Sequence, residues 1–271
     1  MNQAIYRATS TALFVLSLAA TLAGAQTPCT AAPERDEQAM SILKRMADYL
    51  SQAQRLSVTA DIGFDVVQAS GEKIEFGETR KIVIRRPDRA RIDITKRDGA
   101  VSGFVFDGKD ISVFNTRENV YATAAKPGSL DEAIDYFIND LDMRFPLAEL
   151  FSSKFAEMLP NRVRAAYDVG QESIAGVPCD HLALRGDQAD MQLWIAQGDQ
   201  PLPRRLVITY KDAAGQPQFW AQFGDWNLSP EVPDSLFTFT PPEGAAKIAF
   251  ASQRPVQTGE KERKGRKAAR P

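Results

Sequence analysis

Apolar residues follow two different periods in the first part of the chain. Between residues 36 and 54 they recur at every third or fourth position, which is the stripe of an amphipathic helix. This stripe consists of Met40, Leu43, Met46, Ala47, Leu50 and Ala53. From residue 57 apolar and polar residues alternate instead, so Val58, Ala60, Ile62, Phe64 and Val66 share one side of a strand. The pattern predicts a helix followed by a half-buried strand.

More alternating segments follow, separated by residues that favour turns. They include Ile74 and Phe76 running on to Ile82 and Ile84, then Ile92 and Ile94, Phe104 and Phe106, and Ile111 and Val113. Turn-forming pairs such as Asp98-Gly99 and Asp107-Gly108 lie between them. This spacing predicts an antiparallel meander with one apolar face.

Two helical segments are expected to interrupt the meander at about residues 129–159. The sequence from Ser129 to Glu132 forms a capping box, and a helical apolar stripe follows it as far as Leu141. A second helix is predicted to open at Pro146 and to stop before Pro160. Strands are then predicted at Tyr167–Gln171, Val177–Arg185, Met191–Ala196, Leu206–Tyr210 and Phe219–Trp226. The predicted fold is therefore mainly β (α+β), with an N-terminal helix and a helical insertion.

The N-terminus has the composition of a secretory signal peptide. Arg7 precedes an apolar run at residues 11–22, and the small residues Ala23, Gly24 and Ala25 follow it. The run is shorter than the ~20 residues that span a bilayer. We therefore predict a cleaved signal peptide at residues 1–25, a linker at 26–35 and one domain at 36–250.

Charge is spread unevenly along the chain. The last segment, residues 251–271, has seven Lys or Arg against two acids and almost no apolar residues, which predicts a disordered basic tail. A solvated tail and transient contact with anionic lipid headgroups are both compatible with this composition. Without the +5 of this tail and the +1 of the signal peptide, the formal net charge of −2 leaves the body near −8. An acidic body does not favour nucleic acid as a partner.

The only histidine, His181, lies two residues after Cys179, one of two cysteines. A zinc site needs three or four ligands, and these residues supply too few soft ones, so no metal site is predicted. The Gly-x-Ser-x-Gly signature of a nucleophilic serine is missing from the sequence, and we predict no catalytic residue and no cofactor. In an exported protein, a disulfide between Cys29 and Cys179 is one alternative and a free buried Cys179 is the other.

The segment "IVIRRPDRARIDITKRDGAVSGFVFDGKDISVFNTRENVYAT" (82–123) resembles the periplasmic lipoprotein carriers of the LolA/LolB class. It shares with them a strand ending in Arg-Pro, a second strand, and Asp-Gly-Lys before the next hairpin. The second half, with "VGQESIAGVPCDHLALRGDQADMQLWIAQGDQPLPRRLVITYKD" and "FTFTPPEGAAKI", resembles a family of predicted bacterial periplasmic proteins of unknown function related to those carriers.

The resemblance implies a periplasmic, unclosed antiparallel β-barrel around an apolar cavity, with the helical insertion as a lid. Arg86 of the Arg-Pro motif would then bond to lid backbone, whereas without the resemblance it is an ordinary charge at the sheet rim. The expected cavity lining is Phe64, Phe76, Ile84, Ile92, Phe104 and Phe137.

The resemblance favours a non-enzymatic carrier or binding protein for a lipid, a lipoprotein acyl chain or another apolar ligand. The alternative is an interaction or envelope-sensing module that binds an envelope protein partner through the same fold.

Overall fold

The structure is a computed structural model that describes residues 35–140 and 146–250. The predicted signal peptide and tail, Cys29, and all of the predicted linker except Arg35 lie outside these ranges. None of the helices in the described part is long and apolar enough to cross a membrane.

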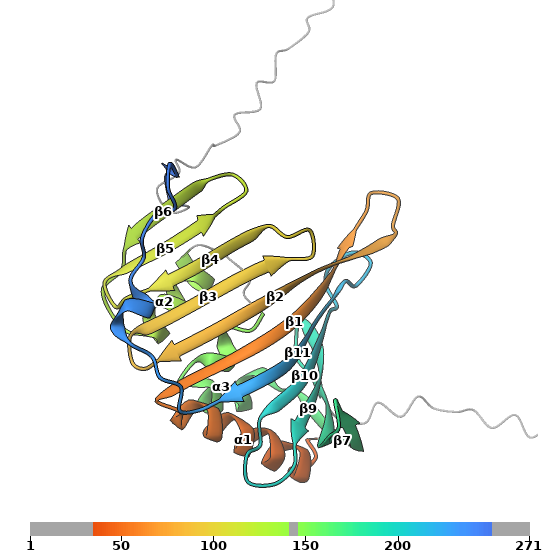
Figure 1. Cartoon of the computed structure of the whole chain (residues 1–271). Coiled ribbons are helices and arrows are strands. Elements are labelled where there is room, and N and C mark those ends of the chain that lie inside the picture. Colours follow the sequence, from red (N-terminus) through yellow and green to blue (C-terminus); the bar gives the residue numbers. More distant parts are fainter. Residues whose placement is uncertain (1–34, 141–145, 251–271) are drawn as a thin grey trace, which may run out of the picture. The chain divides into compact units, whose positions relative to one another are not determined.

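The order of elements follows the sequence pattern (Figure 1). The helices are α1 (Glu37–Gln52), α2 (Leu130–Asp135) and α3 (Phe155–Arg162), with the π-helical turn η1 (Tyr136–Asp140) and the 3-10 turns η2 (Glu149–Phe151) and η3 (Asp234–Phe237). The strands of the first part are β1 (Arg55–Val67), β2 (Lys73–Arg85), β3 (Arg89–Lys96), β4 (Val101–Phe106), β5 (Asp110–Asn115) and β6 (Val120–Ala125). Those of the second part are β7 (Ala165–Ile174), β8 (Val177–Arg185), β9 (Ala189–Ala196), β10 (Pro203–Tyr210), β11 (Gln218–Asn227) and β12 (Ala246–Lys247).

Within the described residues, twelve strands form one sheet in the order β12-β6-β5-β4-β3-β2-β1-β11-β10-β9-β8-β7. The end strands β12 and β7 do not pair with each other, so the sheet is unclosed. The predicted fold class is confirmed, namely mainly β with an N-terminal helix and a helical insertion. One detail differs, because the short β12 lies parallel to β6 and the sheet is therefore mixed.

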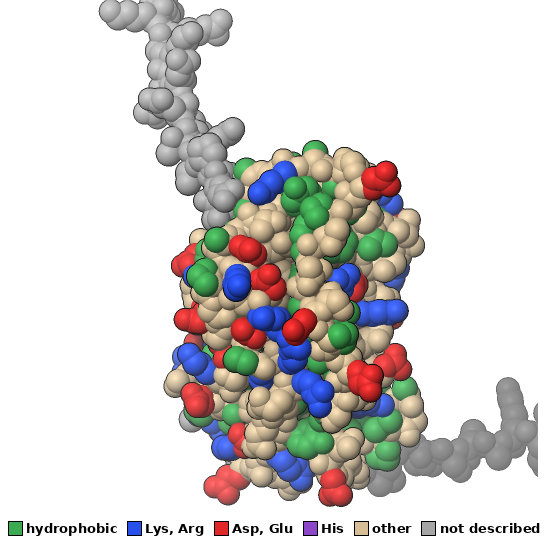
Figure 2. Space-filling view, turned by 60° about the vertical axis from the view of Figure 1, so that its left-hand side comes forward, with side chains coloured by type: hydrophobic (Ala, Val, Ile, Leu, Met, Phe, Trp, Pro, Cys, Tyr) green, Lys and Arg blue, Asp and Glu red, His purple; other side chains and the backbone are tan. Residues whose placement is uncertain are grey.

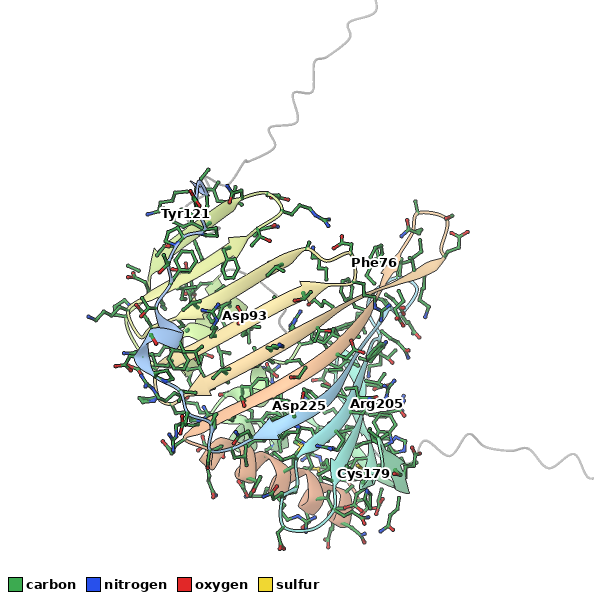
Figure 3. The ribbon with its side chains drawn as sticks, viewed as in Figure 1. Phe76, Asp93, Tyr121, Cys179, Arg205 and Asp225 are labelled. Atoms are coloured by element: carbon green, nitrogen blue, oxygen red, sulfur yellow. The ribbon has the colours of Figure 1, made fainter. Side chains whose placement is uncertain are left out.

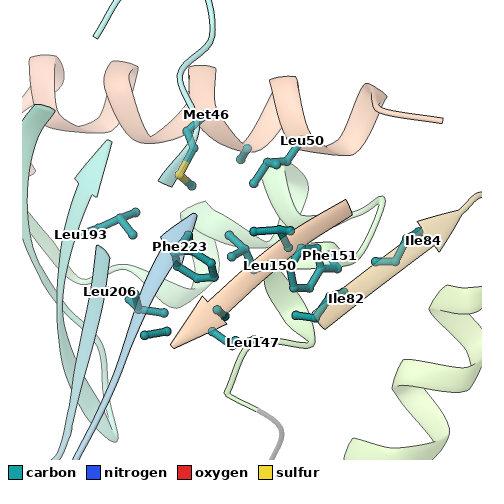
Figure 4. Close-up of a cluster of buried hydrophobic side chains, with 14 of the residues drawn as sticks. Met46, Leu50, Ile82, Ile84, Leu147, Leu150, Phe151, Leu193, Leu206 and Phe223 are labelled. Carbon is teal, nitrogen blue, oxygen red and sulfur yellow. The ribbon is translucent and has the colours of Figure 1, made fainter. Parts of the chain in front are cut away.

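Helix α1 forms where the apolar stripe predicts it. The side chain of its N-cap, Asp36, accepts hydrogen bonds from the backbone N–H of Gln38 and Ala39, at 2.8 and 3.4 Å, which pairs donors that a helix start leaves free. One face of α1 is buried, through Ala39, Ile42, Leu43, Met46, Ala47 and Leu50. This face contacts β7, β9, η2 and α3, and Figure 4 shows Met46 and Leu50 above Leu193, Leu206 and Phe223 of the sheet.

The insertion (residues 129–162) differs from the prediction in its second helix. Instead of one helix from residue 146 to 159, the structure has η2, a break at Ser152 and Ser153, and then α3. The break forms because both serines donate hydrogen bonds to the side chain of Asp131 instead of continuing a helix. Helix α3 also passes through Pro160 and ends at Arg162. A proline this close to the helix end removes only one helical N–H bond.

The C-terminal segment (residues 228–250) crosses the outer face of the sheet before it reaches β6. Arg85 of β2 donates to Asp234 and to the carbonyl of Val232, at 2.5 and 3.0 Å. Further on, the Phe239 ring packs against Phe114 and Tyr121. On the face that Figure 2 shows, Lys and Arg side chains are interspersed with Asp and Glu.

Candidate functional site

The inner face of strands β2–β6 is built from three rows of side chains that run across the strands. Strand register defines each row, since directly paired residues point to the same face. The first apolar row is Ile82, Ile92, Phe104, Val113 and Ala122. The second apolar row is Ile84, Ala90, Phe106, Ile111 and Ala124. The third, which we name the polar row, is Arg80, Ile94, Ser102, Asn115 and Val120.

A cavity of about 510 Å³ lies against these rows. Every residue of the first apolar row and of the polar row lines the cavity. Ile84 and Ala90 of the second apolar row line it as well. The insertion supplies its other wall, through Leu130, Ala133, Ile134, Phe137, Leu147, Ala148 and Phe151. Ile248, Ala249 and Phe250 of the C-terminal segment complete it. The volume falls in the range of ~300–1,000 Å³ that is usual for ligand pockets.

Phe137 of η1 joins the three parts of this wall. Its ring meets that of Phe104 edge-on, with 5.5 Å between the centroids. The Phe250 ring lies 6.3 Å from it on another side. The insertion therefore contacts both the sheet and the C-terminal segment across the cavity, through aromatic side chains.

Four of the six residues expected to line a cavity do lie in its wall: Ile84, Ile92, Phe104 and Phe137. Phe64 and Phe76 do not, and this part of the prediction is corrected. They face the predicted side and stack on each other at 6.2 Å, but they lie on the part of the β1–β2 hairpin that extends past β3. Phe76 is 49% exposed there, and Figure 3 shows it where the hairpin leaves the neighbouring strands.

Arg86 connects the rim of the sheet to the insertion. Its Nη2 donates to the carbonyl oxygen of Phe151 at 2.7 Å, and its Nε donates to the carbonyl of Ala53, beyond the end of α1, at 3.1 Å. Burial lowers the pKa of the Arg86 guanidinium, while the charge of Asp131 acts in the opposite direction. Arg86 thus holds η2 and the end of α1 together at one edge of the cavity.

Asp131, at the start of α2, holds the second half of the insertion in place. Its Oδ1 accepts hydrogen bonds from the Ser152 hydroxyl and the Ser153 backbone N–H, at 2.9 and 2.8 Å, and its Oδ2 accepts one from the Ser153 hydroxyl. Partial burial raises the pKa of Asp131, but the bonds from Ser153 and Ser152 and the charge of Arg86 outweigh it, so the pKa lies below its usual value. We name Arg86, Asp131, Ser152 and Ser153 the latch.

His181 and Cys179 lie on the outer face, away from the cavity. The two ring nitrogens of His181 lie 3.1 Å from Glu172 Oε1 and Gln192 Oε1, and its ring stacks on Trp194 at 4.1 Å. In the described part of the chain, no group of three or more His, Cys, Asp and Glu side chains is placed to hold a metal ion. His181 is thus held by an amide, a carboxylate and an indole on three sides.

Cys179 carries a free, fully buried thiol, and burial raises its pKa. Its suggested partner, Cys29, lies outside the described residues, and the disulfide between them stays a prediction. Figure 3 labels Cys179 on β8 and Arg205 on β10, with β9 between these strands. The Arg205 guanidinium lies over the rings of Trp194 and Trp220, at 5.8 and 5.3 Å.

The sequence analysis did not identify the polar row. Arg80, Ser102 and Asn115 occupy inward positions of strands whose other inward residues are mostly apolar. Polar residues at inward positions were therefore the available signal in the sequence for a polar part of the cavity. The register of the five strands was needed to show that these residues form one row.

Comparison with known proteins places the chain in one family. The family model described as "Predicted periplasmic protein (DUF2092)" matches residues 39–251. A search among curated proteins found no significant match.

Solved structures give weaker likenesses. The lipoprotein LppX of Mycobacterium tuberculosis is 15% identical over 73% of this chain and 100% of its own, with a TM-score of 0.45. A LolA superfamily protein from Nitrosomonas europaea is 15% identical over 74% of this chain and 97% of its own, with a TM-score of 0.36. MucB, in the Pseudomonas aeruginosa MucA/MucB complex, is 17% identical over 74% of this chain and 61% of its own, with a TM-score of 0.38. Likenesses of this strength do not extend to ligands.

The family match covers most of the chain and includes every strand of the sheet. The chain belongs to the DUF2092 family of predicted periplasmic proteins, and it is a periplasmic protein.

Proposed function

We propose that the protein is a non-enzymatic periplasmic carrier or binding protein that holds the acyl chain of a lipid or lipoprotein, or another apolar ligand, in the cavity. The observation that carries this proposal is the cavity of about 510 Å³ and its walls. Two of its sides, the first apolar row and the insertion, are almost entirely apolar. A methylene group that leaves water for such a surface gains about 0.8 kcal/mol.

The latch suits a ligand that must enter and leave. Covering a bound chain requires the insertion to stay near the sheet. Arg86 bonds to its backbone there, Asp131 joins its two parts, and buried apolar residues such as Phe151 pack against the sheet. A net hydrogen bond contributes about 0.5–1.5 kcal/mol, and bonds to charged groups contribute about 1.5–3 kcal/mol. Bonds of this size add to the packing of the insertion and can still break at moderate cost.

Filling the cavity tests the proposal. Ile84→Trp and Ile92→Trp each place an indole in the cavity wall, so we expect uptake of a fluorescent fatty-acid probe to fall at least tenfold. Thermal unfolding should change little, because the added ring enters existing space. Overfilling a packed core costs about 1–3 kcal/mol instead. The matched control is Val83→Trp, which lies between these rows on the outer face and should bind the probe like wild type.

Loosening the latch is a second test of the same proposal. In Arg86→Leu the carbonyl of Phe151 loses its donor, and we expect the bound probe to dissociate several times faster. If wild type takes up no probe and both tryptophan variants unfold, the cavity is part of the core and the proposal is wrong.

A protein-interaction module is the alternative function, and the β1–β2 hairpin favours it. Val66, Ile74 and Phe76 are 40%, 46% and 49% exposed there, and a contiguous exposed apolar surface often contacts another protein. Native mass spectrometry of protein purified from the periplasm separates the two functions. The carrier should retain a lipid mass that Ile92→Trp lacks, whereas an interaction module should be empty in both forms.

A further inference from the structure

One end of the cavity differs in chemistry from the rest. In the two apolar rows, every residue from β2 to β6 is apolar. In the adjacent polar row, three of five positions change to Arg80, Ser102 and Asn115, and all three line the cavity. Glu118, in the turn between β5 and β6, lines the same end. The cavity is thus amphipathic along the direction of the strands.

The polar row presents hydrogen-bond donors that the protein does not use. Among the described residues, the Ser102 hydroxyl has no hydrogen-bond partner, and neither does the Nδ2 of Asn115. The Oδ1 of Asn115 is already occupied, since it accepts from the backbone N–H of Arg117 and Glu118, at 3.0 and 3.2 Å. The side chain of Asn115 is therefore fixed by its oxygen, and its nitrogen remains available to a ligand.

Arg80 supplies a further donor but little net charge. Its Nε and Nη2 bond to Oε1 of Glu78 at 2.7 and 2.5 Å, and the side chains of the pair are only 17% and 9% exposed. The Nη1 of Arg80 has no partner among the described residues. Because Glu78 already neutralises the guanidinium, this end of the cavity selects for oxygen acceptors more than for negative charge.

The size of the cavity limits the apolar part of a ligand. With about 30 Å³ for each methylene group, the share of a water molecule in the liquid, the volume of about 510 Å³ is on the scale of one chain of 16 to 18 carbons. A single long chain with one polar end matches both the volume and the arrangement of the rows.

We propose, on the basis of the proposed carrier function, that the ligand is a single-chain acyl lipid whose carbonyl or carboxyl oxygens bind to Arg80, Ser102 and Asn115. The hydrocarbon chain crosses the first apolar row, away from the polar row and toward the insertion. The acyl carbonyl is common to free fatty acids and to acyl esters, so both are sources of the same recognised group.

The test uses purified full-length mature protein and displacement of bound N-phenyl-1-naphthylamine. The competitors are palmitic acid, 1-monopalmitoylglycerol and hexadecane, which share the chain and differ in the oxygen-bearing end. Ser102→Ala removes one donor without breaking a bond within the protein. Asn115→Asp keeps the oxygen that caps the turn and replaces the Nδ2 donor with an acceptor.

We expect each variant to bind 1-monopalmitoylglycerol about fivefold more weakly, and the double variant at least tenfold more weakly, as lost neutral hydrogen bonds predict. Hexadecane should change less than twofold. Because the monoglyceride is uncharged, its loss of affinity does not come from repulsion between two net charges, and Ser102→Ala tests the loss of a donor with no change of charge. Thr95→Ala, on the outer face of β3, is the matched control and should bind all three like wild type.

The affinities of wild type for the three competitors identify the chemical source of the acyl group. Tighter binding of palmitic acid assigns a free carboxylate, and tighter binding of the monoglyceride assigns an ester; either result supports the proposal. Native mass spectrometry should find one palmitate per protein. Three results would overturn this proposal and leave the carrier function standing. The variants could lose equal affinity for hexadecane and the monoglyceride, they could keep wild-type affinities, or wild type could bind two palmitates per protein. If wild type binds none of the three competitors, the carrier function itself fails.

Discussion

The two halves of the sheet carry the same alternation of residues but enclose different interiors. In the filled half, which comprises β1 and β7–β11, α1 lies directly on the inner face, and Met46 and Leu50 are 0% and 1% exposed. In the cavity half, β2–β6, the covering element is the insertion, and a space of about 510 Å³ remains beneath it. Alternation determines which residues face inward, and the covering element determines whether that space is filled.

The difference between the halves follows from the helices that cover them. Helix α1 has 16 residues and a continuous apolar face, so it fits against several strands at once. The insertion consists of short pieces: the six-residue α2, a π-helical turn, a 3-10 turn and the eight-residue α3. Arg86 bonds it to the sheet rim. Short helices attached at one edge leave room between themselves and the sheet.

Truncating one apolar residue in each half should show the largest contrast. Leu50→Ala removes a side chain from a filled interior, and we expect a loss of about 2–5 kcal/mol in the free energy of unfolding. Ile92→Ala removes a side chain that borders existing space, so we expect a smaller loss, about 1 kcal/mol. Urea denaturation of both variants measures the two losses. Equal losses would show that the halves are packed alike and that the cavity is not an open space in solution.

Residue alternation predicted the fold closely, because each strand repeats the same two-residue period. It could not predict how far one strand extends past the next. Phe64 and Phe76 have the correct orientation, but β1 and β2 each have 13 residues while β3 has 8, so these rings project beyond the cavity half. Strand length relative to a neighbour depends on pairing, which a single sequence does not show.

The polar row was missed for a related physical reason. Ser102 and Arg80 are 22 residues apart in the chain, and only the register of β2, β3 and β4 brings them into one row. The break at Ser152 was missed as well, since it depends on the side chain of Asp131 in another helix. Both features arise from contacts between distant segments, and neither has a local pattern.

The latch should make closure of the cavity half depend on pH. We expect an effect on ligand release that is smaller than the contrast between the two truncations and larger than the effect of substituting His181. The pKa of Asp131 in the folded protein lies below its usual value of 3.8. The stabilisation by its charge is therefore present above that value and is lost as the pH falls through the lower, folded-state pKa. In Asp131→Asn we expect the fluorescent probe to dissociate about tenfold faster at pH 7, as weaker bonds to a neutral acceptor predict. Stopped-flow dilution measures this rate.

A matched control separates the latch from a general effect of lost charge. The pKa of Asp187 is also lowered, by its bond with Arg164, but Asp187 neither lines the cavity nor contacts the insertion's latch. Asp187→Asn should release the probe at the wild-type rate. If both variants release the probe at the same rate, the latch does not control closure. Ligand exchange in the cavity half would then need another explanation.

Substituting His181 should have the smallest effect, because it lies on the outer face of the filled half. His181→Gln loses the stacking on Trp194, worth about 0.5–1.5 kcal/mol, while its amide can still bond to Glu172 or Gln192. A loss of about 1 kcal/mol lowers the Tm of a domain of this size by about 2–4 °C. Probe binding in the cavity should be unchanged, and elemental analysis should find no stoichiometric zinc or copper in either form. One metal ion per chain in wild type, lost in His181→Gln, would show a binding site in the filled half. That result would contradict the assignment of ligand binding to the cavity half alone.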